Sequence, residues 1–269
     1  WIFDLNNMLY GSLFMLCGAY TLAQNAHVRG DFLYSSMRPR TQALLDLKLP
    51  EGRPVAILSG NSIEHALMTM AAMQARAAAG IVLDVHTGEI VSLVSMPLFN
   101  PNRVGMAGTE QLRNTVTQSV YELGSAFKPI TMAVAIDSGV VTDMSRRFDA
   151  TVPLQVGRFK IKDDHPQKRW LNIPETLIHS SNIATARIAD LIGPQRMQGM
   201  FRKLGFDTKP DIELREKGRP LWPTFWARTT TMTTAYGHGI AVTPLHLASA
   251  YAALVNGGVW RPSTLLKVQ

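Results

Sequence analysis

A serine and a lysine stand three residues apart in the stretch GSAFKP, residues 124–129. On a helix this spacing places Ser125 and Lys128 on one face. A lysine beside a serine can act as the base that activates a hydroxyl nucleophile, provided that burial lowers its pKa. A helix N-terminus at Ser125 would also stabilise an oxygen that develops negative charge. The structural alternative is a capping serine followed by a surface lysine.

A second polar cluster, Ser180-Ser181-Asn182, follows about 55 residues later. Here the Ser180 hydroxyl could relay a proton, and the Asn182 amide could hold an amide of a substrate. Both residue types are also ordinary helix caps, and Ser59-Gly60-Asn61 shows the same loose pattern. The chain contains no Lys-Thr-Gly, and we interpret His86-Thr87-Gly88 and Lys203-Leu204-Gly205 as structural.

The elements that must position these residues follow from hydrophobic spacing and from turn residues. Helical spacing predicts helices over 62–79, 125–139 and 244–258, and two helical pieces over 172–193 that break at the Ser-Ser-Asn. A further short helix is predicted over 194–206, whereas 103–120 has the composition of a polar loop. A hairpin is predicted over 80–97, and short strands over 148–166. The predicted class is therefore mixed α and β (α+β), with helices packed on a sheet.

The composition and net charge limit the classes of binding partner that the chain can have. The chain has 269 residues, 46% of them hydrophobic, a formal net charge of +7 and a pI near 9.7, which suits an anionic surface such as a membrane or a cell-wall polymer. The basic residues are scattered rather than interleaved with aromatic residues, so we predict no nucleic-acid partner. A single cysteine, Cys17, and the absence of paired histidine motifs indicate neither a disulfide nor a metal site.

The N-terminal part predicts a division into three segments. Residues 1–25 resemble a membrane anchor, because Met8–Ala23 is apolar and uncharged over about the shortest length that spans a bilayer. A buried helix or a signal remnant is the alternative for this segment. Residues 26–61 are interpreted as a linker, because they are rich in proline, glycine and charge, and we place a boundary near residue 60 before the domain over residues 62–269.

Residues 62–269 carry several motifs in the order in which class B penicillin-binding proteins have them, and the chain resembles that family. The motif YGHGIAVTPLHLA looks more like the division-specific (septal) branch than the cell-elongation branch. The segments that carry the resemblance are AAAGIVLDVHTGEIVSLVSMPLFNPN, YELGSAFKP, IKDDHP, SSNIATARIA, AYGHGIAVTPLHLASAYAALVNGG and WRPSTLL.

The resemblance implies a septal peptidoglycan DD-transpeptidase. Ser125 would attack the penultimate D-Ala carbonyl of a stem peptide, with Lys128 as general base, Ser180 as proton shuttle and Asn182 holding the substrate amide. β-Lactams would acylate the same serine, and no metal or organic cofactor is implied. The implied fold is an antiparallel sheet flanked by helices with a helical subdomain, incomplete before its last strands. Residues 62–269 would be the transpeptidase domain, and residues 26–61 would be either a linker or the remnant of the pedestal domain that the family has. The implied location is the inner membrane, with the catalytic domain on the periplasmic side and a glycosyltransferase and other divisome proteins as partners.

The chain also departs from the family pattern. Leu123 and Ala126 stand where the family usually has Pro and Thr, and both changes look tolerable. Because the Lys-Thr-Gly strand is missing, we expect weak or no turnover by the chain as given. Two rival functions remain open: a serine β-lactamase or DD-carboxypeptidase, which releases the acyl group to water, and a non-catalytic divisome scaffold.

Overall fold

The computed structural model describes residues 55–58 and 79–268 of the chain. The chain divides into two compact units, Trp1–Asp46 and Leu47–Gln269, and every described residue belongs to the second unit. The predicted anchor over residues 1–25, the linker over 26–61 apart from 55–58, and all but the last residue of the predicted helix over 62–79 lie outside the described residues. None of the helices within the described ranges is long and apolar enough to cross a membrane.

A three-stranded sheet forms one layer of the second unit. It contains β1 (Val55–Leu58), β2 (Ala79–Leu83) and β3 (Ile90–Ser95) in the order β1-β2-β3. The antiparallel β2–β3 pair confirms the predicted hairpin, and the Asp84 carboxylate accepts the N–H groups of two residues in its turn. β1 pairs parallel to β2, so the described sheet is mixed rather than purely antiparallel as expected. The connection 59–78 is longer than the dozen or so residues that a parallel pair needs.

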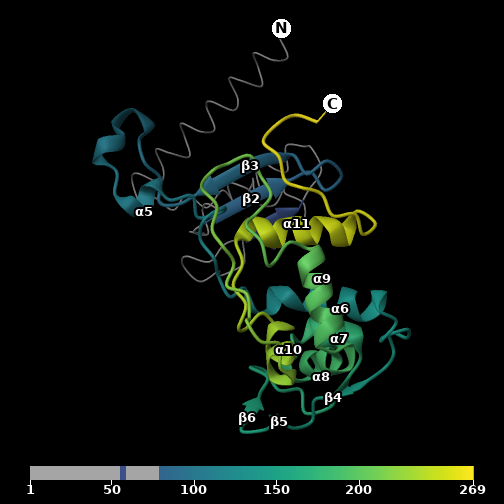
Figure 1. Cartoon of the computed structure of the whole chain (residues 1–269). Coiled ribbons are helices and arrows are strands. Elements are labelled where there is room, and N and C mark those ends of the chain that lie inside the picture. The colour runs from purple at the N-terminus through teal and green to yellow at the C-terminus, as the bar shows by residue number, and fades with distance from the viewer. Residues whose placement is uncertain (1–54, 59–78, 269) are drawn as a thin grey trace, which may run out of the picture. The chain divides into compact units, whose positions relative to one another are not determined.

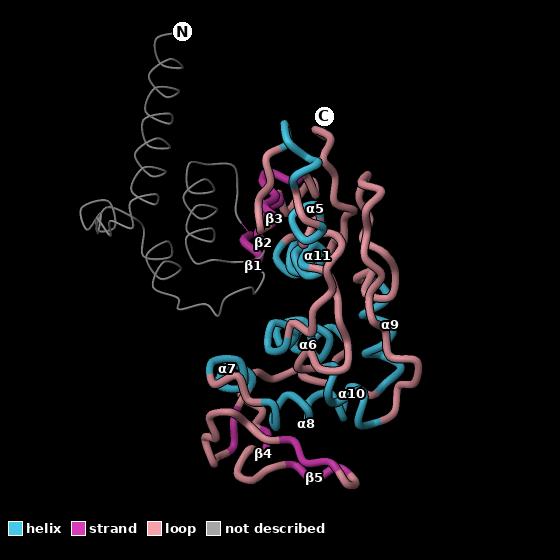
Figure 2. The backbone as a smooth tube through the Cα atoms, turned by 90° about the vertical axis from the view of Figure 1, so that its left-hand side faces the viewer, coloured by secondary structure: helices cyan, strands magenta, loops and turns pink. Residues whose placement is uncertain are grey.

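Helix α11 (Pro244–Val255) covers this sheet, as Figures 1 and 2 show. The Thr243 side chain accepts the N–H of His246 and begins the helix, which confirms the predicted start at Thr243-Pro244. The small residues Ala248 and Ala252 let the helix approach the strands closely. The core between helix and sheet consists of Ala79, Ile81, Leu83, Val116, Ile212, Leu245, Ala248 and Ala252.

A helical layer packs on the other side of α11, with α6 next to it and α8 beyond α6 (Figure 2). Its elements are the 3-10 turn η2 (Gly124–Phe127), α6 (Lys128–Asp137), α7 (Ile173–Ile178), α8 (Asn182–Ile192), α9 (Pro194–Lys203) and α10 (Arg228–Thr234). Three buried rings, those of Phe127, Phe201 and Phe206, meet at centroid distances of 5.7, 5.3 and 5.4 Å. These contacts join α9 to the turn that carries Ser125.

Short strands at the far end of the helical layer confirm the strands predicted over 148–166. β4 (Phe148–Asp149) pairs with β7 (Trp170–Leu171), and β5 (Leu154–Val156) pairs with β6 (Phe159–Ile161). The loop predicted over 103–120 was partly wrong, because it holds the end of η1 (Pro101–Met106) and α5 (Thr109–Leu112). Helix α10 was not predicted. Its sequence, RTTTMTT, has poor helix propensity, and burial of Thr231, Met232 and Thr234 stabilises it instead.

The ring cluster predicts a large stability difference between two phenylalanines. Phe201→Ala removes a fully buried ring and should lower the free energy of unfolding by about 3–5 kcal/mol, because the cavity that it leaves is lined by other rings. Phe225→Ala is the matched control, since that ring is 77% exposed and should cost little. Urea unfolding curves of the two variants measure the difference, and equal midpoints would contradict the assigned core.

Candidate active site

Ser125 and Lys128 lie where the 3-10 turn η2 passes into α6. Ser125 is in η2 and is exposed, whereas Lys128 is the first residue of α6 and is only 1% exposed. The sequence predicted one continuous helix from Ser125, but its first turn is 3-10, as is frequent at helix ends. Burial of Lys128 rules out the surface lysine of the structural alternative. The nucleophile candidate is thus accessible and the base candidate lies beneath it.

Lys128 joins both predicted serines in one hydrogen-bonded group. Its Nζ donates to Ser125 Oγ at 3.0 Å and to Ser180 Oγ at 2.8 Å. Ser180 Oγ in turn donates to Ser125 Oγ at 2.9 Å, so the nitrogen and the two hydroxyl oxygens form a closed triangle. The Ser180 carbonyl accepts a third hydrogen bond from Nζ at 2.5 Å. An ammonium has three donors, and all three are used here.

Ser180 reaches this triangle from the turn between α7 and α8. Its φ is +51°, a left-handed conformation that residues other than glycine rarely adopt. That conformation lets both the carbonyl and the hydroxyl of one residue face Lys128 Nζ. Unfavourable backbone of this kind persists only where surrounding contacts hold it, and it concentrates at functional sites.

Burial lowers the pKa of Lys128 from 10.5 to about 8, although the charges of Asp163 and Asp164 act in the opposite direction. At pH 7 a base with this pKa is neutral in roughly one molecule in ten, against roughly one in three thousand for an ordinary lysine. A neutral amine can accept the hydroxyl proton of Ser125, either directly or through Ser180. The site is therefore suited to activating an alcohol as a nucleophile and to returning its proton to a leaving group.

Asp163 holds the Ser180 turn in place, a role that the sequence did not indicate. This carboxylate is buried, and it accepts Ser181 Oγ at 2.8 Å and the Ile183 N–H at 2.9 Å. Asp163 thereby accepts a backbone N–H group at the start of α8 that has no partner within the helix. Ser181 caps the same helix by accepting the Ala184 N–H. The acid belongs to the segment IKDDHP, but a contact across some 20 residues leaves no local spacing signal.

Asn182 is the first residue of α8, two positions after Ser180. Its Nδ2 donates to the Lys162 carbonyl at 3.1 Å, which ties α8 to the segment that supplies Asp163. The hydrogen bonds of the described residues thus unite Ser125, Lys128 and Ser180, and they leave Asn182 beside that group rather than in it.

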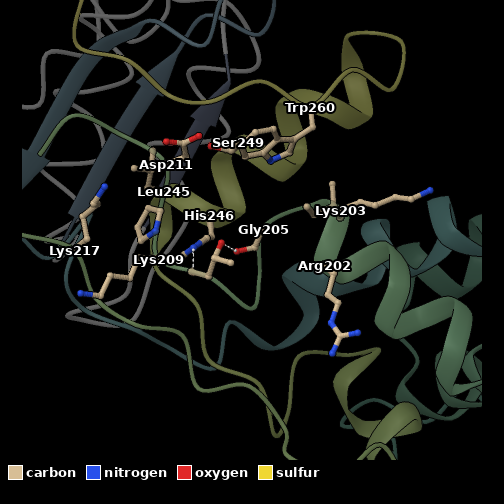
Figure 3. Close-up of a pocket in the computed structure, with 13 residues that line it drawn as sticks. Arg202, Lys203, Gly205, Lys209, Asp211, Lys217, Leu245, His246, Ser249 and Trp260 are labelled. Atoms are coloured by element: carbon tan, nitrogen blue, oxygen red, sulfur yellow. Dashed lines mark hydrogen bonds between the residues drawn. The ribbon is translucent and has the colours of Figure 1, made fainter.

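A cavity of about 360 Å³ lies apart from these residues, between the end of α9 and α11 (Figure 3). Arg202, Lys203, Lys209 and Lys217 line it but point in different directions rather than toward one anion. Burial lowers the pKa of His246 to about 4. Its ring nitrogens are hydrogen-bonded to the Thr243 hydroxyl and to the Thr208 carbonyl. This neutral histidine is structural. Across residues 55–58 and 79–268, no three His, Cys, Asp or Glu side chains are grouped to hold a metal ion.

The geometry predicts that Asp163→Asn lowers the pKa of Lys128. The carboxylate favours the charged ammonium, so its removal should bring the pKa below about 8. The asparagine keeps an oxygen for the Ile183 N–H, which preserves the start of α8. A pH titration of the Lys128 side-chain carbon signal by NMR measures the change.

Two further variants make this titration decisive. Asp164→Asn should shift the Lys128 pKa in the same direction but less, because Asp164 is the weaker of the two influences. Asp143→Asn, an exposed carboxylate that makes two similar bonds to Ser145, should leave it unchanged. A Lys128 pKa that rises or stays constant in Asp163→Asn would contradict the assignment.

Comparison with known proteins now identifies the family. The sequence profile of the penicillin binding protein transpeptidase domain matches residues 78–269. The chain is 44% identical over 193 residues to a protein named probable peptidoglycan D,D-transpeptidase FtsI of Caulobacter vibrioides, covering 72% of this chain and 33% of that one. It is 33% identical over 196 residues to probable peptidoglycan D,D-transpeptidase PenA of Neisseria gonorrhoeae, with the same coverage. The chain thus spans about a third of the length of these curated relatives.

Solved structures agree with the sequence matches. The apo transpeptidase domain of penicillin-binding protein 3 from Burkholderia pseudomallei aligns with a TM-score of 0.63 and 26% identity, over 87% of this chain and 61% of that one. Both share the mixed α and β fold. The chain therefore belongs to the penicillin-binding protein transpeptidase family, in the class B branch that its motifs resembled.

Proposed function

We propose that this chain carries the acyl-transfer centre of a division-specific peptidoglycan D,D-transpeptidase. The observation that supports it most directly is the buried Lys128 Nζ, which lies within hydrogen-bond distance of both serine hydroxyls. The exposed Ser125 hydroxyl is open to a substrate, and its base is already beneath it. Relatives named FtsI and PenA favour cross-linking as the reaction that this centre serves.

In the first step Ser125 Oγ attacks the penultimate D-Ala carbonyl of a stem peptide, and its proton passes to Lys128. The bond to the terminal D-Ala breaks, and that amine leaves with a proton returned through Ser180. In the second step an amine of a neighbouring stem peptide attacks the ester and gives up its proton to Lys128. As the ester bond breaks, this proton returns to Ser125 Oγ and the serine hydroxyl is restored. Asn182 orients the amide of the bound peptide at the edge of the site. The covalent ester divides one difficult acyl transfer into two easier ones.

The surroundings of this centre are part of the same proposal. The catalytic domain works on the periplasmic side of the inner membrane, with Met8–Ala23 as the anchor. A glycosyltransferase and other division proteins are its partners, peptidoglycan stem peptides its substrates, and β-lactams its inhibitors. The charge of +7 supports an anionic cell-wall environment.

Two rival functions use the same residues in other ways. A β-lactamase or DD-carboxypeptidase would form the same ester and release it to water, so the lifetime of the ester separates it from a transpeptidase. A non-catalytic scaffold would form no ester.

Acylation by penicillin is the direct test of the proposal. Intact mass spectrometry after incubation with benzylpenicillin should show one stable adduct, because Ser125 is accessible and activated. Ser125→Ala should show none. Ser145→Ala, which removes an exposed serine that bonds only to Asp143 among the described residues, is the matched control and should still be acylated.

The other outcomes of the mass measurement select among the rivals. An adduct that disappears within seconds while penicillin is consumed indicates hydrolysis, and the transpeptidase proposal would then fail. If the chain gains no adduct, the non-catalytic scaffold is the remaining function. That function predicts that Ser125→Ala supports normal cell division.

The Lys128 pKa also predicts the pH dependence of acylation. Only the neutral amine accepts the Ser125 proton, so the rate of adduct formation should rise about tenfold per pH unit below 8 and level off above it. Stopped-flow acylation with a chromogenic cephalosporin from pH 6 to 10 gives this profile. A rate that continues to rise toward pH 10.5 would show that Lys128 titrates like an exposed lysine.

A further inference from the structure

A segment that follows α10 runs beside the segment that carries Ser125. Tyr121 and Val242 exchange both backbone hydrogen bonds, at 2.9 and 3.1 Å, as an isolated antiparallel bridge. The Glu122 carboxylate accepts the Gly239 N–H at 3.1 Å. Residues 235–242, which we call the seat segment, are thereby joined to the chain just before the nucleophile.

Gly237 is the point where the seat segment comes closest to that chain. A Cβ on Gly237 would lie 2.2 Å from the Gly124 carbonyl oxygen, 2.6 Å from its nitrogen and 2.7 Å from its Cα. These are backbone atoms, so no side chain could rotate away to relieve the contact. Gly237 also has a φ of +80°, which glycine adopts without strain. Backbone therefore packs directly on backbone at the residue before Ser125.

Other contacts prevent the nucleophile turn from moving away freely. Tyr251 of α11 donates its hydroxyl to the Ala126 carbonyl at 2.9 Å, one residue after Ser125. Thr131 of α6, which is fully buried, donates to the Ala235 carbonyl at 2.7 Å and holds the seat segment to the same helix. The turn thus lies between α11 and the seat segment. Because Gly237 has no side chain, the backbone of the turn can pack directly on it, and this contact sets the position of the turn.

We propose that Gly237 is a positioning residue for the nucleophile. The Gly124 peptide packs on the Cα of Gly237, which carries no side chain. This contact sets the distances from the Ser125 hydroxyl to Lys128 Nζ and to the Ser180 hydroxyl. The residue touches neither substrate nor the reacting atoms. The inference rests on the proposed function for its kinetic consequence, but the contact itself concerns only the geometry of the site.

The test is Gly237→Ala, compared with the unchanged chain in acylation by benzylpenicillin. Ordinary contact distances require the Gly124 peptide to move outward by about 1 Å, and a misplacement of that size costs on the order of 100-fold in rate. We expect this loss in the rate constant of acylation, with the non-covalent dissociation constant nearly unchanged. A loss confined to the dissociation constant would overturn the proposal.

Two glycines serve as matched controls. Gly239→Ala imposes the same left-handed strain, with a φ of +77°, but its nearest contact would be Thr233 Oγ1 at 3.7 Å. Gly218→Ala reproduces the collision with backbone, 2.0 Å from the Gln118 carbonyl oxygen, at a place six residues before Gly124. Both should retain the acylation rate within about fivefold. A loss in either control equal to that in Gly237→Ala would overturn the proposal.

A second measurement separates this inference from the proposed function. The Lys128 side-chain carbon signal reports on the position of Ser125 Oγ, 3.0 Å away, without any substrate. It should shift in Gly237→Ala and not in Gly239→Ala. If the unchanged chain is not acylated, the proposed function fails, and the NMR comparison still decides the role of Gly237: equal signals in both variants refute it.

A variant with an intact glycine covers the case in which Gly237→Ala does not fold. Thr131→Val keeps the shape of the side chain and removes its hydrogen bond to the Ala235 carbonyl, so the seat segment is held less firmly. We expect the acylation rate to fall about fivefold to tenfold, again in the rate constant and not in the dissociation constant, together with a shift of the Lys128 signal. Unchanged values of both would refute the seating role.

Discussion

The structure depends on keeping the Lys128 amine out of water while leaving it three hydrogen-bond acceptors. Removing an ammonium from water is costly, and the observed partners offset only part of that cost, so the pKa falls rather than the lysine turning outward. Two of the acceptors are the hydroxyls of Ser125 and Ser180, which take part in the proposed chemistry. The desolvation of the lysine in this position is therefore also what suits it to act as a base near neutral pH.

This constraint explains the arrangement of the helices around it. The turn η2 and the start of α6 bring Ser125 and Lys128 together, and the turn just before α8 carries Ser180. The two helices pack against each other over a core that includes Phe127, so the distance between their starts is fixed by packing. A hydroxyl on a loop alone would not hold its place to within a fraction of an ångström.

The charges near the site have to balance two requirements. Asp163 stabilises the Ser180 turn by accepting two hydrogen bonds, yet its charge favours the protonated form of Lys128. Desolvation is the larger influence and keeps the pKa near 8. The acyl transfer proposed for this chain needs both forms of the base during one cycle, first to take a proton and then to return it. A pKa near the working pH serves both steps.

The sequence by itself determined the elements whose signals are local: the hairpin around Gly88, the break at Ser180, the helix that begins at Pro244, and Ser125 with Lys128 as the candidate pair. Periodicity and turn chemistry act over a few residues, so they can be seen in the chain directly. Only the tertiary structure decided that Lys128 is buried, because burial depends on helices distant in sequence. The parallel partner of β2, the burial of helix α10, and the contacts of Asp163 and Gly237 likewise depend on residues distant in sequence. The Asp163 contacts join residues 18 and 20 positions apart, and the Gly237 contact joins residues more than 100 positions apart, where spacing carries no signal.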